Sequence, residues 1–97
     1  MNLIDAVINN DIEMVRQLLE DGADPNMCID EAKLRPLHFA AQSNYLEVGK
    51  LLIAAGADPH AETIPDKETP LEVAQLHENK EFARLLLAHK DGGDSIN

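Results

Sequence analysis

The side chains best able to bind a metal ion in this 97-residue chain are those of Cys28, His38, His60, His77 and His89. Structural zinc sites usually take their ligands in close pairs, about two to four residues apart. No two of these five residues are that close in the sequence. We therefore expect no metal site, and we interpret His38, the strongest single candidate, as a structural histidine.

Catalysis needs a nucleophile or base that a second group orients in a partly desolvated site. The sequence shows no such grouping, because the four histidines fall at unrelated positions of the repeat described below. Two pairs of carboxylates, Asp30 with Glu31 and Asp66 with Glu68, could attract a cation. They lack the alternating oxygen ligands and the central glycine of a calcium loop, so we interpret them as solvated loop charge. We expect no cofactor and no enzymatic activity.

A repeat of 34 residues determines where these side chains lie. The segment Leu51–His60 repeats Gln17–Asn26, and the same offset pairs Pro36 with Pro70, so about three copies cover the chain. Each copy is predicted to form two short helices followed by a loop, and Asn44 is expected in a left-handed turn between helices. In the first two copies a glycine, Gly22 or Gly56, follows the second helix, whereas the third copy lacks this stop. Thr69 and Glu72 have the spacing of a capping box. The predicted helices span residues 3–9, 12–20, 37–44, 46–55, a short segment from 70, and 80–89.

Three motifs, Pro36-Leu-His-Phe-Ala-Ala41, Gly56-Ala-Asp-Pro-His60 and Thr69-Pro-Leu-Glu-Val-Ala74, resemble the ankyrin repeat over residues 3–90. The resemblance implies an all-α fold, a solenoid of three helix-turn-helix units joined by hairpin-like loops. It implies one domain over residues 1–91, with repeats at about 1–29, 30–63 and 64–91, and a flexible tail over 92–97. It also assigns His38 to the family histidine that hydrogen-bonds the adjoining loop.

The chain departs from the family pattern at three positions. Arg35 replaces the usual threonine, Glu72 replaces the usual histidine, and Lys67 stands where a turn glycine is common. Neither inter-repeat loop, 27–35 or 61–69, contains glycine. We therefore expect irregular hairpins.

The formal charge of −10, from 18 acidic and 8 basic residues, disfavours nucleic acids and anionic lipids. It is consistent either with a solubilising surface or with a protein partner that has a basic surface. The single cysteine fits a reducing compartment, no apolar run approaches the roughly 20 residues of a membrane span, and the amino terminus lacks the pattern of a signal peptide. We expect a cytoplasmic protein.

The resemblance implies that a partner would bind at the loop tips and at the concave face of the first helices. The corresponding positions are Ile8, Asn9, Glu31, Leu34, Gln42, Ser43, Asp66, Glu68, Gln75 and Leu76. We add Tyr45, in the turn between two helices, as a candidate aromatic anchor. Three of them, Ile8, Leu34 and Leu76, are apolar. Either these three residues form an exposed row with an acidic rim, or neighbouring segments cover them.

We expect a non-enzymatic protein-interaction module that acts as an adaptor, inhibitor or regulatory subunit. The alternative is an acidic decoy, an immunity-type inhibitor that masks a basic nucleic-acid-binding surface. We expect a monomer, although Leu85–Leu87 near the carboxy end could support oligomerisation.

Overall fold

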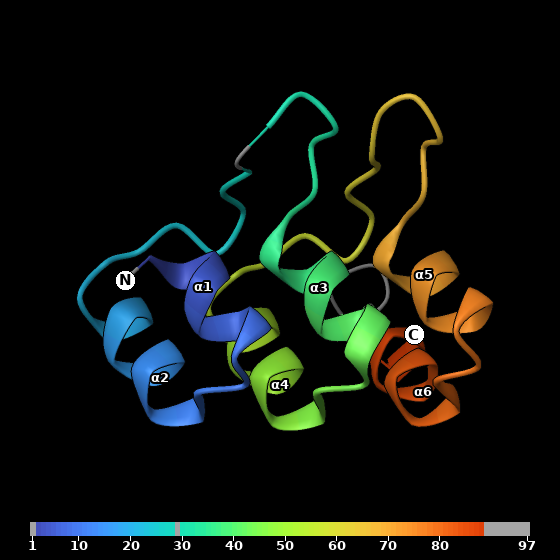
Figure 1. Cartoon of the computed structure of the whole chain (residues 1–97). Helices are drawn as coiled ribbons and strands as arrows, with labels where there is room; N and C mark the ends of the chain where they lie inside the picture. Colours follow the sequence, from blue (N-terminus) through green and yellow to red (C-terminus); the bar gives the residue numbers. More distant parts are fainter. Residues whose placement is uncertain (1, 29, 89–97) are drawn as a thin grey trace, which may run out of the picture.

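The computed structural model describes residues 2–28 and 30–88, and this part of the chain forms six helices and no strand. Figure 1 shows them as three antiparallel pairs placed side by side. The helices are α1 (Leu3–Ile8), α2 (Ile12–Glu20), α3 (Pro36–Ser43), α4 (Leu46–Ala54), α5 (Pro70–Leu76) and α6 (Lys80–Ala88). The predicted all-α fold of three helix-turn-helix units is confirmed, while the predicted tail 92–97 and His89 lie outside the described residues.

Local chemistry determines where most helices begin. The Asn2 side chain accepts a hydrogen bond from the Asp5 amide at 2.9 Å and thereby caps α1. The predicted capping box of α5 is present, since Thr69 Oγ1 accepts from the Glu72 amide at 3.2 Å and Glu72 Oε1 accepts from the Thr69 amide at 3.0 Å. Pro36 is the first residue of α3, where a missing N–H costs nothing.

Left-handed backbone recurs at the same three positions of the repeat. The residues involved are Asn10, Asn44 and Glu78 between paired helices, Gly22 and Gly56 after second helices, and Lys33 and Lys67 in the long loops. Their φ values lie between +53° and +104°. Glycine and asparagine tolerate this conformation, whereas glutamate and lysine have a Cβ that crowds the next carbonyl. The third unit thus keeps the turn geometry of the others with a less suitable residue, Glu78.

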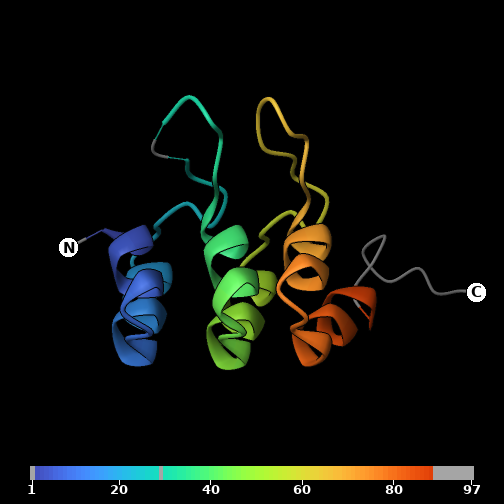
Figure 2. The same cartoon turned by 45° about the vertical axis from the view of Figure 1, so that its right-hand side comes forward.

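The helices form two layers (Figure 2): α1, α3 and α5 lie in one layer, and α2, α4 and α6 in the other. Alanines and aliphatic side chains fill the space between the layers, and Ala6, Ala40 and Ala74, 34 residues apart, are fully buried. A close contact joins α4 to α6, where the buried Phe82 ring lies against Gly49.

The two long loops, 21–35 and 55–69, project on the same side of the helices (Figures 1 and 2). Within the second loop, the Thr63 amide donates to the Glu68 carbonyl at 3.0 Å and the Lys67 amide donates to the Thr63 carbonyl at 2.8 Å. The two loops also bond to each other, because the Ile64 amide donates to the Ala32 carbonyl at 2.8 Å. Neither loop contains a strand in its described residues, which agrees with the predicted irregularity.

Candidate functional site

His38 has a structural role. Its side chain is 1% exposed, and Nε2 lies 3.0 Å from the Ala61 carbonyl oxygen and 2.9 Å from that of Glu68. Because Nδ1 accepts a hydrogen bond from the Arg35 amide at 3.1 Å, Nε2 carries the proton and donates to these carbonyls. Burial lowers the pKa of His38, and the two carbonyl hydrogen bonds oppose this effect. The ring therefore anchors the second long loop to α3.

Metal-binding side chains do not converge in the described part of the chain. No group of three or more histidine, cysteine, aspartate or glutamate residues there could hold a metal ion. Cys28 is half-buried in the first long loop. Both nitrogens of His38 are engaged by backbone groups, so its ring is not available as a ligand.

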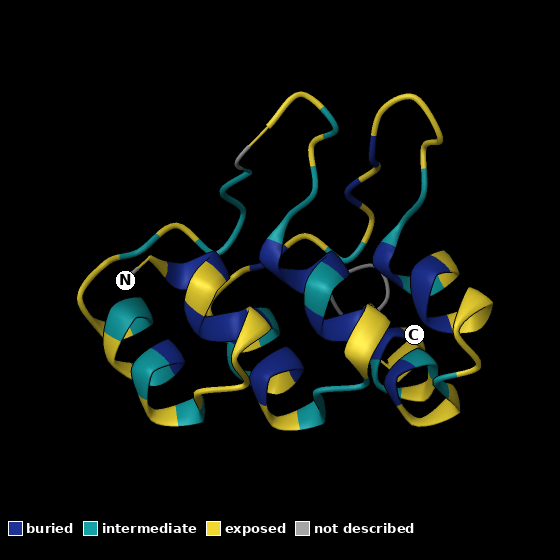
Figure 3. Cartoon of the chain, in the orientation of Figure 1, coloured by how far each residue is buried: buried dark blue, intermediate teal, exposed yellow. Residues whose placement is uncertain are grey.

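Most of the predicted partner-binding residues lie on the surface (Figure 3). The exposed ones are Ile8, Asn9, Glu31, Gln42, Ser43, Asp66, Gln75 and Leu76. Leu34, Tyr45 and Glu68 are half-buried. Of the three apolar candidates, Ile8 is 48% exposed and Leu76 is 67% exposed, whereas Leu34 is mostly covered. Of the predicted row of three apolar residues, only Ile8 and Leu76 are therefore exposed.

Four predicted residues gather around one hollow. It has a volume of about 390 Å³ and lies between the second long loop and α5, with Asp66, Glu68, Glu72, Gln75 and Leu76 as its lining. The hollow is shallow and largely open to solvent. Glu72, which the sequence prediction did not include, adds a third carboxylate. The capping box of α5 fixes the position of that carboxylate.

Other predicted residues lie apart from the hollow. Ile8 and Asn9 are at the end of α1, and Tyr45 lies in the turn before α4, where it packs against the core. Two exposed aliphatic residues lie outside the predicted set: Leu87 on α6 is 48% exposed, and Ile64 in the second long loop is 53% exposed. An isoleucine before proline in an otherwise polar loop was the available signal.

Gln75 occupies a different repeat position from the one assigned to it. The offset of 34 relates it to Ala41 and Val7, both fully buried, whereas Leu76 is the equivalent of Gln42 and Ile8. Gln75 is exposed because no further unit in the described chain covers the outer side of α5.

Charge is unequally divided between the two sides of the stack. We call α1, α3, α5 and the long loops 21–35 and 55–69 the front face, and α2, α4 and α6 the back face. Counted by chain segment, the front face has ten acidic and three basic residues, a net charge of −7, and one of these acids, Asp21, accepts a hydrogen bond from Gln17 of α2. The back face has four acidic and four basic residues and no net charge. The first helices contain no lysine or arginine.

The family model that describes ankyrin repeats in three copies matches residues 3–97. The chain is an ankyrin-repeat protein. Ankyrin repeats are generic protein–protein interaction modules, and the family is typically non-enzymatic. A search of curated proteins found no match. None of the helices in residues 2–28 and 30–88 has the length and apolar character needed to span a membrane.

Proposed function

We propose that this ankyrin-repeat protein binds a protein partner with a basic contact surface through its front face, as a non-enzymatic adaptor, inhibitor or regulatory subunit. The observation that carries the proposal is the separation of charge between the two faces. A net charge of −7 on one face attracts a basic surface and orients it during encounter, whereas a neutral face does neither.

Exposed aliphatic residues on the front face supply the second component of an interface. Leu76 lines the same hollow as Asp66 and Glu72, the exposed Ile64 lies two residues before Asp66 in the second long loop, and Ile8 lies on the same layer of helices. Apolar contacts surrounded by charged groups are the usual arrangement of a specific interface. The front face therefore combines apolar anchors with an acidic rim.

The back face offers a weaker alternative surface. A hollow of about 330 Å³ lies between α2 and α4, but its two charged residues, Arg16 and Glu20, carry opposite charges. Arg16 is also paired with Glu13 on its own helix. This surface has no charge complementarity to offer a basic partner, so we place the interface on the front.

The same field bears on the other partners considered. A front face of −7 repels phosphate backbones and anionic lipid headgroups, which favours a protein over nucleic acid or membrane. It also repels a second copy of the chain face to face. We therefore propose a monomer. The single cysteine, which fits a reducing compartment, supports the proposal that it acts in the cytoplasm.

The test is capture of the partner from a lysate of the source cells with the full chain and with surface variants. Ile8→Glu and Leu76→Glu should each reduce capture strongly, because a buried carboxylate in an apolar contact is costly. Ala54→Glu is the control, since Ala54 is exposed on α4 and lines the hollow of the back face. Equal loss with all three variants, loss with Ala54→Glu alone, or loss with none of them would place the interface elsewhere.

The charge separation also fits a narrower function, in which the front face masks the nucleic-acid-binding surface of the partner. In that case electrostatic attraction would dominate affinity, and binding would weaken steeply between low and physiological ionic strength. Nucleic acid would also compete with the chain for the partner. A shallow salt dependence without competition would leave the general function and exclude this narrower one.

A further inference from the structure

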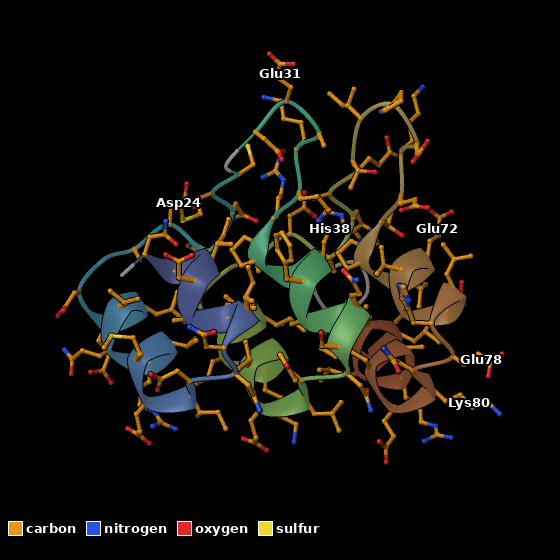
Figure 4. The ribbon with its side chains drawn as sticks, in the orientation of Figure 1. Asp24, Glu31, His38, Glu72, Glu78 and Lys80 are labelled. Atoms are coloured by element: carbon orange, nitrogen blue, oxygen red, sulfur yellow. The ribbon has the colours of Figure 1, made fainter. Side chains whose placement is uncertain are left out.

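The hollow beside α5 is the place where a further repeat would stack. We call its five lining residues the end slot: Asp66, Glu68, Glu72, Gln75 and Leu76. Their equivalents one repeat earlier are Ala32, Leu34, His38, Ala41 and Gln42. Figure 4 shows Glu72 on the side of α5 that faces away from α3 and His38. The end slot is thus the open counterpart of an interface that is occupied between the second and third repeats.

In the occupied interface, four of the five equivalent positions make hydrogen bonds to the next repeat. The carbonyls of Ala41 and Gln42 accept from Asn79 Nδ2 at 2.7 and 2.9 Å. The Ala32 carbonyl accepts from the Ile64 amide at 2.8 Å. These three bonds show that this surface offers backbone acceptors to a neighbour. In the end slot, the Gln75 carbonyl accepts the Glu78 amide at 3.1 Å and keeps a second lone pair for another donor.

The fourth position, occupied by His38 in one repeat and by Glu72 in the next, changes from a hydrogen-bond donor to an acceptor. His38 donates to two carbonyls of the next loop, but its equivalent, Glu72, has only acceptors, one of which bonds the Thr69 amide. Asp66 and Glu68 add two carboxylates whose oxygens accept no hydrogen bond from residues 2–28 and 30–88. A further ankyrin unit would bring loop carbonyls against Glu72, acceptor against acceptor. The slot is therefore built for an occupant rich in donors.

A second copy of this chain does not meet that requirement. In head-to-tail stacking, the first repeat would supply Asp11 at the position equivalent to Asn79, which places a carboxylate against the slot carbonyls. Each copy also carries a charge of −10. Like charges brought together in this way disfavour association.

We propose that the end slot binds an arginine side chain from a basic segment of the protein partner. The guanidinium group has five donors in a planar fork that matches carboxylates, and its apolar stem can lie along Leu76, which is 67% exposed. The inference rests on the proposed function, since it names one contact of that partner. It concerns the part of the front face that lies between α5 and the second long loop.

The probe is the peptide acetyl-Gly-Arg-Leu-Arg-Gly-amide, titrated into the full ¹⁵N-labelled chain at physiological ionic strength while amide chemical shifts are recorded. The matched control peptide has citrulline in place of both arginines, which keeps the shape and removes the charge. Saturable shifts should concentrate at residues 66–68 and 72–76, and the citrulline peptide should bind more weakly by about fivefold or more, the effect of losing charge-assisted hydrogen bonds.

Two variants separate the slot from general attraction. Glu72→Gln retains an oxygen for the capping box and removes the charge, so it should weaken the arginine peptide about fivefold. Glu20→Gln removes an exposed carboxylate from α2 and should leave the affinity unchanged. Circular dichroism confirms that both variants are folded.

Several results would overturn the inference. They are shifts that miss the end slot, equal binding of the two peptides, equal weakening by Glu72→Gln and Glu20→Gln, or slot shifts that follow protein concentration without peptide, which would indicate a second copy. If one of these results is found and partner capture still depends on Ile8, the proposed function stands and the arginine proposal for the end slot fails. If the peptide binds at the slot but no partner is captured, the arginine proposal stands and the proposed function fails.

Discussion

Gly49 should be indispensable for stacking the third repeat on the second. A Cβ at this position would lie 2.6 and 2.7 Å from Cε2 and Cζ of Phe82 and 3.3 Å from Cδ2 of Leu85. Carbon atoms in favourable contact are about 3.5–4.0 Å apart, so the first two contacts are about 1 Å too short. The Phe82 side chain is fully buried in the core. Gly49→Ala must therefore displace α6 from α4.

Two opposing terms set the expected effect. Replacing glycine by alanine inside a helix favours folding by about 1 kcal/mol. Overpacking of a close-packed core costs about 1–3 kcal/mol, and contacts this short point to the upper part of that range. We expect Gly49→Ala to lower the free energy of unfolding by about 1–2 kcal/mol.

Urea denaturation followed by helical circular dichroism measures this difference. Ala83→Gly, the reverse change at the equivalent position of α6, is a control that should cost about 1 kcal/mol or more, because it loses helix propensity and the contact of a half-buried methyl group with the core. Phe82→Leu removes the crowded ring atoms, so Gly49→Ala should be less harmful in that background by about 1 kcal/mol or more. A gain in stability from Gly49→Ala alone, or strict additivity in the double variant, would refute the reasoning.

Three further predictions concern pH and local bonds. The pKa of His38 is lowered in the folded chain, so the unfolded chain takes up the proton first as pH falls. The contribution of His38 to the free energy of unfolding is therefore complete above pH 6.5 and is lost below that value, by at most about 1.4 kcal/mol per pH unit. Urea unfolding should show this slope in the wild type and in His77→Gln but not in His38→Gln, and equal slopes in all three would contradict it. Glu78→Asn should raise the free energy of unfolding by about 0.5–1 kcal/mol, because φ is +58° there and asparagine occupies the equivalent turns; unchanged stability would argue against strain. Asn79→Ala should lower the free energy of unfolding by about 1–2 kcal/mol through two lost hydrogen bonds to the second repeat, and a loss no greater than that of an exposed-surface variant would mean that water replaces them.

The sequence predicts those features of the fold that depend on neighbouring residues. Thr69 and Glu72 form their capping box because both partners lie within one turn of helix. Gly22 and Gly56 end helices because the left-handed conformation is easiest for glycine. These signals recur at a fixed offset, so the order and approximate length of the six helices follow from them.

Features that depend on stacking could be predicted only in part. The bond from the Ile64 amide to the Ala32 carbonyl joins residues of two loops, and no local pattern specifies it. The exposure of Gln75 was predicted, but the reason for it was not. The equivalent residues Val7 and Ala41 are buried in the stack, whereas no further unit in the described residues covers Gln75. The sequence showed that Glu72 departs from the family pattern, but it did not show that this side chain lies on the outer side of α5. The composition of the hollow thus becomes clear only once the interface between repeats has been seen.

Amide hydrogen exchange of the chain in complex with its captured partner tests the central claim, that the acidic front face is the interface. Binding should slow exchange in residues 30–35 and 63–69 and in α5, which lie on the front face, while α2, α4 and α6 keep the rates of the free chain. Slower exchange confined to α2, α4 and α6 would contradict the account.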